Sequence, residues 1–573
     1  MRPASRIPPA AVSAGRRSPP APRCRRPCVR PLLRLRAILG PGTCLPVGRG
    51  PGLLGGGSSA WAVHAEKSES GDALLLINPH IPWSGPYRLF EARTVSPGRT
   101  CHGVTPLGFP WQSFAYGPRT GWTHTVNPVP QLWVYELDIS KDRYRHDGTT
   151  LPLEHREHVI EVRGGPSVTV DERRSVHGPV TTAPDGADVA IRVAGVLHEP
   201  VTTALECWWQ MSLAEDVHEL LAAQDRWPLP MFNVIAADAQ GTVAAAFCGA
   251  TPERPGGRFE DSQRRLPGED PAQLWHRLNP PESLPRVVNP ECGWVQNVNE
   301  TPWWFCDPPL APEDYPDGIA PPPDRIRDIR SPLSRTWMKA QQVFSPRTLL
   351  DLKWQTRAHL ADQVLEDLLS ACARELGLQE AARVLRHWDR CADPESRGYL
   401  LFHLWAHDHF PISAVVMDDA RLIPSVEAGG LPRGLVDPAG AVATLRRAAA
   451  RLDELGWDGK VQYGEAARIG GAVPASGGPT FFGLFKCLEL LPGEDTWEAI
   501  GGDTWISLVR FAGTGPEASG MLLPGNTTEP GAPPQRPQAP YFAAEELHPH
   551  APLPQEPSRS GRPTSAPRPE TRP

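Results

Sequence analysis

The sequence lacks several patterns that mark common enzyme and membrane-protein classes. None of its 11 cysteines forms a Cys-x-x-Cys pair, which argues against a zinc ribbon and a thioredoxin-like redox motif. The Gly-x-Ser-x-Gly elbow of α/β-hydrolases and the P-loop are also absent. No run approaches the ~18 apolar residues that a membrane-spanning helix needs. We therefore expect no membrane span, no cofactor and no bound metal.

Acidic residues are missing from the start of the chain. No Asp or Glu precedes Glu66, whereas 11 arginines lie between Arg2 and Arg49, so the rest of a chain of net charge −7 carries −18. A basic arm of this kind can contact nucleic acid or act as an organelle transit peptide. Its many prolines, and the lack of an apolar helical stripe or a continuous signal-peptide core, argue against both. We expect no nucleic-acid partner, and the arm does not identify a compartment.

Proline and glycine divide the chain into three parts. The 68 prolines and 52 glycines make up about a fifth of the 573 residues, close to the level at which low-complexity segments are expected. Hydrophobic residues at 40% still permit a sizeable core. We predict a disordered Arg- and Pro-rich leader over residues 1–57, a folded domain over 58–545 and a disordered Pro-rich tail over 546–573.

Strand patterns dominate the first half of the folded part. The apolar runs "AWAVHA" and "ALLLIN" flank the turn-like "EKSESGD", and "TGWTHTV" and "QLWVYELDI" follow. Residues 158–171 alternate around Gly-Gly-Pro and residues 232–247 around Gln-Gly, which predicts two antiparallel hairpins. Residues 301–324 hold too many prolines for a regular element, so we expect a long surface loop there.

Helical spacing begins near residue 345. Ser345 and Pro346 are typical of an N-cap and a first turn, and apolar residues then recur at helical spacing up to Gly377. This spacing predicts one helical stretch, followed by a second over 379–388 and a third around 400–405. The early hairpins and the late helices are consistent with an α+β protein.

The serine pair after the glycine run is the first candidate for chemistry. A serine hydroxyl needs a base, and a histidine, a lysine or the chain's own α-amine can serve. Cleavage between Gly57 and Ser58 would give Ser58 both a hydroxyl and an amine, whose reference pKa of ~7.7 to 8.0 suits a general base. The glycines before it permit the strained turn that such a cleavage needs. Taken alone, however, a Gly-Gly-Gly-Ser-Ser run is more often a flexible linker.

A longer set of motifs extends over most of the chain. "GGGSSAWAV", "LLLINPHIPWSG" and "TGWTHTV" are followed in order by "RSVHGPV", "VIAADAQGTVAAAFCG", "GWVQNVNETPW", "ADPESRGYLLFHLW" and "PASGGPTFFG". Over roughly residues 53 to 548 they resemble the large chain of the penicillin acylase family of N-terminal-nucleophile hydrolases, in its branch of acyl-homoserine lactone acylases and aculeacin-type acylases. The resemblance implies a four-layer αββα sandwich. It also implies a periplasmic or secreted protein, although no signal peptide is visible.

The resemblance further implies roles for four residues. Ser58 matches the nucleophile, and His80 matches the histidine beside it. Val126 matches the residue whose backbone N–H enters the oxyanion hole, and Asn299 matches the side-chain donor of that hole. Losing one such donor typically costs ~3 kcal/mol of transition-state stabilisation. Taken singly, His80 also fits a turn residue, and Asn299 fits a loop residue that satisfies backbone groups.

The implied reaction is hydrolysis of the amide bond of an N-acyl small molecule: an acyl-homoserine lactone, an acylated lipopeptide or a β-lactam. The sequence departs from the family pattern at Ser59, where the family usually has Asn. A family arginine lies downstream of the asparagine, and this chain offers four without a clean register: Arg325, Arg327, Arg330 and Arg335.

The largest departure lies ahead of the serine pair. In the family a small chain of some hundreds of residues precedes the nucleophile, whereas the 57 residues here do not resemble it. We therefore expect a truncated or wrongly assigned start, with the small chain absent. The alternative is a catalytically inactive homologue that lacks this small chain.

A metal enzyme is the third hypothesis. In "HLWAHDH", His403 and His407 lie four apart on one helix face with His409 near, but no Glu follows His403 as in H-E-x-x-H. In "HREH", His155 and His158 lie in a strand-like segment, where an offset of three points them to opposite faces. Both patterns are weak signals for a metal.

Overall fold

The structure is a computed structural model of the whole chain. It describes residues 57–554 except 131, 195–200, 227–228, 325–327, 374, 411–421, 424, 426–429, 458–460, 494 and 528–536. The predicted leader up to residue 56 and the predicted tail from residue 555 lie outside the described residues.

The strand that contains Ser58 lies in the largest sheet of the described residues. This sheet has ten strands, and β1 pairs with β2 on one side and with β19 on the other. The strands are β1 (Gly57–Val63), β2 (Leu74–Pro82), β19 (Trp294–Asn297), β20 (Ala467–Ile469), β21 (Val473–Pro474), β22 (Leu488–Leu491), β23 (Trp497–Asp503), β24 (Trp505–Ala512), β25 (Gly515–Leu522) and β26 (His548–Pro549). The predicted strands "AWAVHA" and "ALLLIN" are therefore confirmed as a hairpin.

A second sheet of seven strands faces the first. It contains the predicted strand "TGWTHTV" as β6 and the predicted hairpin over 232–247 as β15 and β16. Its members are β3 (Leu89–Ser96), β4 (Arg99–Pro106), β5 (Phe114–Tyr116), β6 (Thr120–Val126), β15 (Met231–Asp238), β16 (Val243–Gly249) and β18 (Arg286–Val288).

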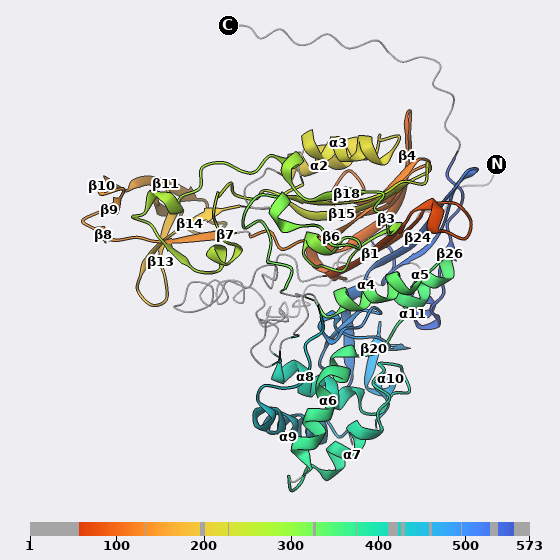
Figure 1. Cartoon of the computed structure of the whole chain (residues 1–573). Coiled ribbons are helices and arrows are strands. Elements are labelled where there is room, and N and C mark those ends of the chain that lie inside the picture. The colour runs from red at the N-terminus through yellow and green to blue at the C-terminus, as the bar shows by residue number, and fades with distance from the viewer. Residues whose placement is uncertain are drawn as a thin grey trace, which may run out of the picture.

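The core clusters show how these sheets and the neighbouring helices are stacked. One cluster joins Ala60 and Ala62 of β1 to Ile235 of β15, so it fills the space between the two sheets. Helices α2 (Val201–Met211) and α3 (Val217–Arg226) pack on the outer face of the seven-stranded sheet. On the outer face of the ten-stranded sheet lie α4 (Arg330–Ala340) and α5 (Pro346–Lys353). The layers therefore follow the order helix, sheet, sheet, helix (Figure 1).

Strand β1 is buried on both of its faces, which explains its apolar sequence. Ala60 and Ala62 point toward the second sheet, whereas Trp61 and Val63 point toward α4 and α5. The Trp61 indole donates a 2.8 Å hydrogen bond to Ser334 Oγ of α4, so the buried ring is also satisfied. This packing holds the start of β1 in the middle of the molecule.

A smaller β lobe extends from the two-sheet body and appears in orange at the left of Figure 1. It includes the predicted hairpin over 158–171, formed by β11 and β12. Its strands are β7 (Leu132–Glu136), β8 (Ile139–Ser140), β9 (Arg143–His146), β10 (Thr149–Pro152), β11 (Glu154–Ile160), β12 (Val168–Ser175), β13 (Gly178–Thr182), β14 (Asp188–Val193) and β17 (Arg265–Pro267).

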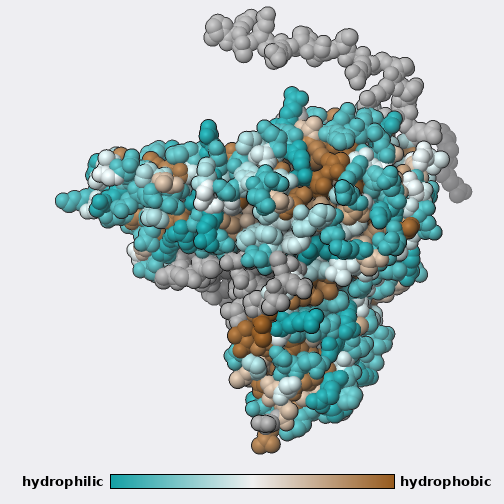
Figure 2. All heavy atoms as spheres, in the orientation of Figure 1, coloured by the Kyte–Doolittle hydropathy of each residue, from teal (hydrophilic) through white to brown (hydrophobic). Residues whose placement is uncertain are grey.

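A helical lobe lies at the opposite end from α2 and α3 (Figure 1). It contains α6 (His359–Cys372), α7 (Gln379–His387), α8 (Tyr399–His409) and α9 (Pro438–Glu454), with the short α10 (Tyr463–Ala466) and α11 (Ala539–Ala544) nearby. The second and third predicted helical stretches are thereby confirmed as α7 and α8. On the face in Figure 2, polar residues cover most of the surface, and apolar residues gather both on the upper part of the two-sheet body and on one side of the helical lobe.

The first predicted helical stretch is wrong as a single helix. Ser345 caps α5 as expected, because its side chain accepts from the Thr348 amide, but α5 ends at Lys353 and α6 begins at His359. Between them, the amide of Ala358 donates to Arg390 O and the carbonyl of Thr356 accepts from Ala392, both at 2.8 Å. This pairing with a distant segment replaces the helical hydrogen bonds and divides the stretch in two.

Other expectations were only partly correct. Residues 301–324 contain no α-helix and no strand, as predicted, but do contain two 3-10 turns. The segment is not a surface loop throughout, because Trp303, Trp304 and Phe305 are buried in the core. Residues 546–554, which we had assigned to the disordered tail, instead carry β26, because His548 and Pro549 pair with β25. Neither α2 nor α3 was predicted. None of the helices in the described part combines the length and the apolar character that crossing a bilayer requires.

Candidate active site

Ser58 is buried at the start of β1, next to His80 of β2. The register sets Ser58 opposite Pro79 and Gly57 opposite His80, and Ser58 is 3% exposed. Its hydroxyl donates a 2.5 Å hydrogen bond to the carbonyl oxygen of Gly57. Its backbone N–H donates to Asn299 Oδ1 at 2.6 Å. The hydroxyl therefore lies against the peptide bond that joins Gly57 to Ser58.

Gly57 has no room for a side chain. A Cβ at this position would lie 2.9 Å from Asn299 Oδ1 and 3.4 Å from His80 Nδ1. The glycine thus permits both side chains to approach the Gly57–Ser58 bond closely. This contact brings Ser58, His80 and Asn299, three of the four sequence-predicted residues, to one place.

Asn299 also contacts Val126, the fourth predicted residue. Its Nδ2 donates to the Val126 carbonyl at 3.2 Å, and its backbone has a left-handed φ of 72°. Asn297 holds this conformation, since its Oδ1 accepts from the Asn299 amide at 2.8 Å and from Thr125 Oγ1 at 2.6 Å. The side-chain Nδ2 of Asn299 carries two N–H groups, and one of them donates to the Val126 carbonyl. The second is left as a donor for a bound group.

The structure identifies Arg330 as the arginine next to the serine. Arg330 is fully buried at the start of α4, and its guanidinium donates to Ser59 Oγ at 3.1 Å and to Asn299 Oδ1 at 3.2 Å. Arg335 instead stacks on the Trp304 ring, with 3.6 Å between its Cζ and the ring centroid. Residues 325 and 327 lie outside the described residues, so Arg330 is the predicted arginine that contacts the site within the described chain.

Asp328 balances the charge of Arg330. Its Oδ2 accepts from Arg330 Nη2 at 2.8 Å and its Oδ1 accepts from Nε at 3.0 Å. Burial acts to lower the pKa of Arg330, but the Asp328 carboxylate outweighs it and raises this pKa above its ordinary value. The guanidinium therefore stays charged although it is fully buried, with fixed donors aimed at the start of β1.

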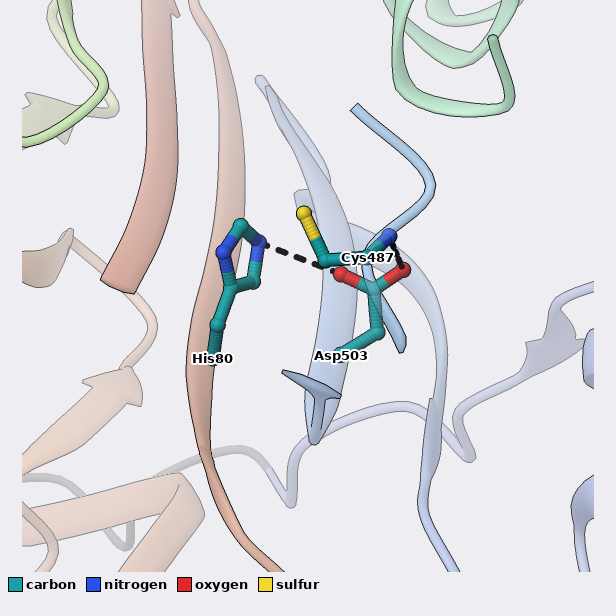
Figure 3. A group of neighbouring side chains, drawn as sticks. All are labelled: His80, Cys487 and Asp503. Atoms are coloured by element: carbon teal, nitrogen blue, oxygen red, sulfur yellow. Dashed lines mark hydrogen bonds and ion pairs between the residues drawn. The ribbon is translucent and has the colours of Figure 1, made fainter. Parts of the chain in front are cut away.

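His80 turns one nitrogen toward Gly57 and the other toward acceptors. Its Nε2 lies 2.9 Å from Asn78 Oδ1. The same nitrogen lies 3.1 Å from Asp503 Oδ1, which Figure 3 shows. Two acceptors at Nε2 require that this nitrogen carries the proton, so Nδ1 holds the lone pair. Within the described chain, Nδ1 has no hydrogen-bond partner. Burial lowers the pKa of His80 to about 4 despite the opposing effect of Asp503.

Comparisons with known proteins identify the family of the chain. The family model for penicillin amidase matches residues 4–556, which is most of the chain. The chain belongs to the penicillin amidase family. This family consists of amide hydrolases of the acylase type.

Two curated relatives of this penicillin amidase family member are distant acylases. The acyl-homoserine lactone acylase PvdQ of Pseudomonas fluorescens Pf-5 is 26% identical over 85% of this chain and 67% of its own length. The aculeacin-A acylase of Actinoplanes utahensis is also 26% identical, over 83% of this chain and 66% of its own length. A solved structure of a thermostable penicillin G acylase from Alcaligenes faecalis superposes with a TM-score of 0.57 at 17% identity, covering 90% of this chain and all of that one. That likeness shows a shared fold.

The histidines of the metal hypothesis do not form a site. His403 and His409 are buried in α8 beside aromatic rings, and neither belongs to a cluster of metal-ligating atoms in the described chain. His155 and His158 bind different carboxylates, Asp171 and Glu172 respectively, on the β11–β12 hairpin. The atoms of His80, Cys487 and Asp503 do lie within 4.8 Å of one another. There, however, an ammonium from Lys353 already contacts the Asp503 carboxylate.

Three charged residues of this penicillin amidase family member were not found from the sequence. Asp328, Lys353 and Asp503 are all buried and contact Arg330 or His80 directly or through one residue. Two of them have a weak local signal, because Lys353 lies between Leu352 and Trp354, and Asp503 interrupts the largely apolar "AIGGDTWISLV". Such a charge is also compatible with an exposed position, so only the fold reveals that it is buried.

Proposed function

We propose that this protein hydrolyses the amide bond of N-acyl small molecules, with Ser58 as an N-terminal nucleophile that self-cleavage exposes. The observation that carries the proposal is the convergence of Ser58, Asn299, His80 and Arg330 on the Gly57–Ser58 bond. We further propose that the stacked layers correspond to the four-layer αββα sandwich of N-terminal-nucleophile hydrolases.

Self-cleavage would use the hydroxyl that already lies against Gly57. Attack of Ser58 Oγ on the Gly57 carbonyl carbon breaks the C–N bond and forms an ester, while the Ser58 nitrogen takes up a proton and becomes a free amine. Water then hydrolyses the ester, which releases the Gly57 carboxylate and restores the hydroxyl. The 2.5 Å contact between Oγ and the Gly57 oxygen supports this step, since it fixes the hydroxyl beside the bond.

The same residue would then act on the substrate. Its freed α-amine, with a reference pKa of ~7.7 to 8.0, takes the hydroxyl proton as Oγ attacks the acyl carbon. The amine stays oriented by Asn299 Oδ1, which lies 2.6 Å from the Ser58 nitrogen. The leaving amine accepts the proton, and water hydrolyses the acyl ester to free the acid. His80 Nδ1 offers a second proton acceptor beside the nucleophile.

The oxyanion would be held by two neutral donors. The backbone N–H of Val126 and the second side-chain N–H of Asn299 Nδ2 would present fixed dipoles to the oxygen of the reacting carbonyl. Arg330 adds a positive charge 3.2 Å from Asn299 Oδ1, which fixes the orientation of this amide. Removal of one donor from such a hole typically lowers kcat by ~10²- to 10³-fold.

The substrate class rests on the names of the relatives. One relative is described as an acyl-homoserine lactone acylase, one as an aculeacin-A acylase and one as a penicillin acylase 2 proenzyme. The bond that they share is an amide between an acyl group and an amine. We therefore propose an N-acyl amide as substrate, with acyl-homoserine lactones, acylated lipopeptides and β-lactams as the compounds to test.

Mass spectrometry and a substrate panel together test the proposal. We expect purified wild-type protein to contain a new N-terminus at Ser58 and to release free acid from at least one N-acyl compound. Ser58→Ala should stay uncut and inactive. Ser507→Ala is the matched control, because it removes another buried serine hydroxyl from the same sheet, and it should be cut normally. Uncut wild-type protein, or activity that survives in Ser58→Ala, would contradict the proposal and favour an inactive homologue.

A further inference from the structure

A fully buried lysine lies two contacts away from His80, which pairs with Gly57 beside Ser58. Lys353 is the last residue of α5 and is 0% exposed. Its Nζ donates to Asp503 Oδ2 at 2.6 Å and to the backbone carbonyl of Phe485 at 2.7 Å. A buried ammonium is costly unless its partners compensate the lost water, and these two contacts do so. The proposed reaction assigns no role to this lysine.

The carboxylate of Asp503 joins Lys353 to His80. Its Oδ2 accepts from Lys353 and from the backbone N–H of Cys487 at 3.0 Å, whereas its Oδ1 faces His80 Nε2 at 3.1 Å. Figure 3 shows the Oδ1 and Oδ2 contacts on opposite sides of the carboxylate. The two oxygens therefore have separate partners, and the lysine prevents the carboxylate from rotating its Oδ1 away from the imidazole.

The charges around His80 are few and can be named. Asp503 is the acidic group that faces it, Lys353 and Arg330 are the cations, and Cys487 contributes a thiol. Burial raises the pKa of the Cys487 thiol far above its ordinary value, so this group is neutral. Burial by itself would raise the pKa of Asp503, but Lys353 and His80 hold it below its usual range. Without Lys353, a lone buried carboxylate would draw a proton onto the neighbouring imidazole.

We propose that Lys353 is a positioning residue of this site. Its ammonium orients Asp503 and balances the charge of that carboxylate, so that His80 stays neutral with its Nδ1 lone pair directed at the Gly57–Ser58 bond. The role in catalysis rests on the function proposed above. The arrangement of charge itself is independent of it and is measurable in the uncut chain.

The first experiment measures how the rate of self-cleavage depends on pH in the full-length protein, because the Ser58 nitrogen of the uncut chain is an amide and does not titrate. Lys353→Met should move the acid limb of this rate upward by more than one pH unit, a loss of more than tenfold in the cleavage rate on that limb. Lys353→Arg keeps the cation and should restore the wild-type limb. Lys353→Met/Asp503→Asn removes both charges, and its limb should return to within half a unit of the wild type. A limb that stays in place in Lys353→Met would overturn the proposal.

Lys486→Met is the matched control variant. Lys486 is also buried, but its ammonium pairs with Glu545 at 2.8 Å and not with Asp503. Its loss should lower stability without moving the acid limb. An equal displacement in both lysine variants would mean that the limb reports general loss of structure, which contradicts a specific role for Lys353. If Lys353→Met does not fold, the arginine and double variants decide the question by the same limb.

A second measurement does not depend on activity. In a Ser58→Ala background, the imidazole of His80 is titrated by NMR with labelled histidine, and His80→Asn assigns its signal. Lys353→Met should raise the pKa of His80 by more than one unit. If this rise occurs in a protein that hydrolyses no N-acyl compound, the proposed function alone fails. If the wild type is active but His80 titrates identically in both chains, the role of Lys353 alone fails.

Discussion

Arg330 gives the sharpest test of how the site is held together. Replacement by Met keeps most of the side-chain volume and removes the guanidinium. Asp328 would then lose its contacts at 2.8 and 3.0 Å while remaining 4% exposed. Breaking a buried ion pair by removing one partner costs ~3 to 5 kcal/mol, because the other charge stays in a medium of low dielectric. We expect Arg330→Met to lower the free energy of unfolding by about this amount.

A double variant separates the lost charge from the lost packing. Arg330→Met/Asp328→Asn leaves no uncompensated charge, and replacement of both members of a buried pair is often close to neutral. We therefore expect the double variant to be more stable than Arg330→Met alone. Urea unfolding followed by tryptophan fluorescence measures the difference, in a Ser58→Ala background so that every variant is one uncut chain. A single variant that loses less than ~1 kcal/mol, or a double variant that loses the sum of both singles, would refute the reasoning.

The double variant should separate the effect of Arg330 on the free energy of unfolding from its effect on the rate of self-cleavage. Arg330 donates to Asn299 Oδ1 and Ser59 Oγ as well as to Asp328, and asparagine and methionine replace neither contact. With Ser58 intact, we expect the double variant to fold but to be cut more slowly than the wild type, as followed by denaturing gel. Cleavage at the wild-type rate would show that Arg330 serves stability alone.

Three further outcomes are expected. Asn299→Ala should remove an oxyanion donor and lower kcat by ~10²- to 10³-fold in cut protein, measured with the best compound of the panel, whereas an unchanged kcat would exclude it from the hole. Gly57→Ala should slow self-cleavage on a gel time course, because its Cβ would lie 2.9 Å from Asn299 Oδ1, and normal cleavage would contradict this close fit. Burial lowers the pKa of His80 to about 4 and of His124 and His403 to about 3. The pKa of a histidine in the unfolded chain is ~6.5, so between pH 6.5 and pH 4 the unfolded chain binds more protons than the folded chain. The free energy of unfolding should therefore fall as pH drops from 6.5 toward 4. Urea midpoints that stay constant over this window would contradict the neutral burial of these histidines.

Local patterns predicted the elements whose own side chains determine their structure. The hairpin over 232–247 combines a turn at Gln240-Gly241 with alternating apolar residues, and both signals lie within one short segment. The single helix expected from Ser345 failed for the opposite reason. Its break depends on hydrogen bonds to Arg390 and Ala392, which lie more than thirty residues further along the chain. The helical spacing of the residues on either side of the break does not depend on those partners, so it could not predict the break.

The residue types of the candidate site follow from continuous motifs, because "NPHIPW" contains His80 and "QNVNETPW" contains Asn299. The charge and the orientation of these residues depend on how distant segments pack together. Arg330 was one of four arginines until β1 and α4 packed together, and Lys353 and Asp503 meet across 150 residues of chain. A buried ion pair leaves only a weak local pattern, since its two members resemble ordinary surface charges. Its effect on His80 comes from the low dielectric that the folded layers create around it.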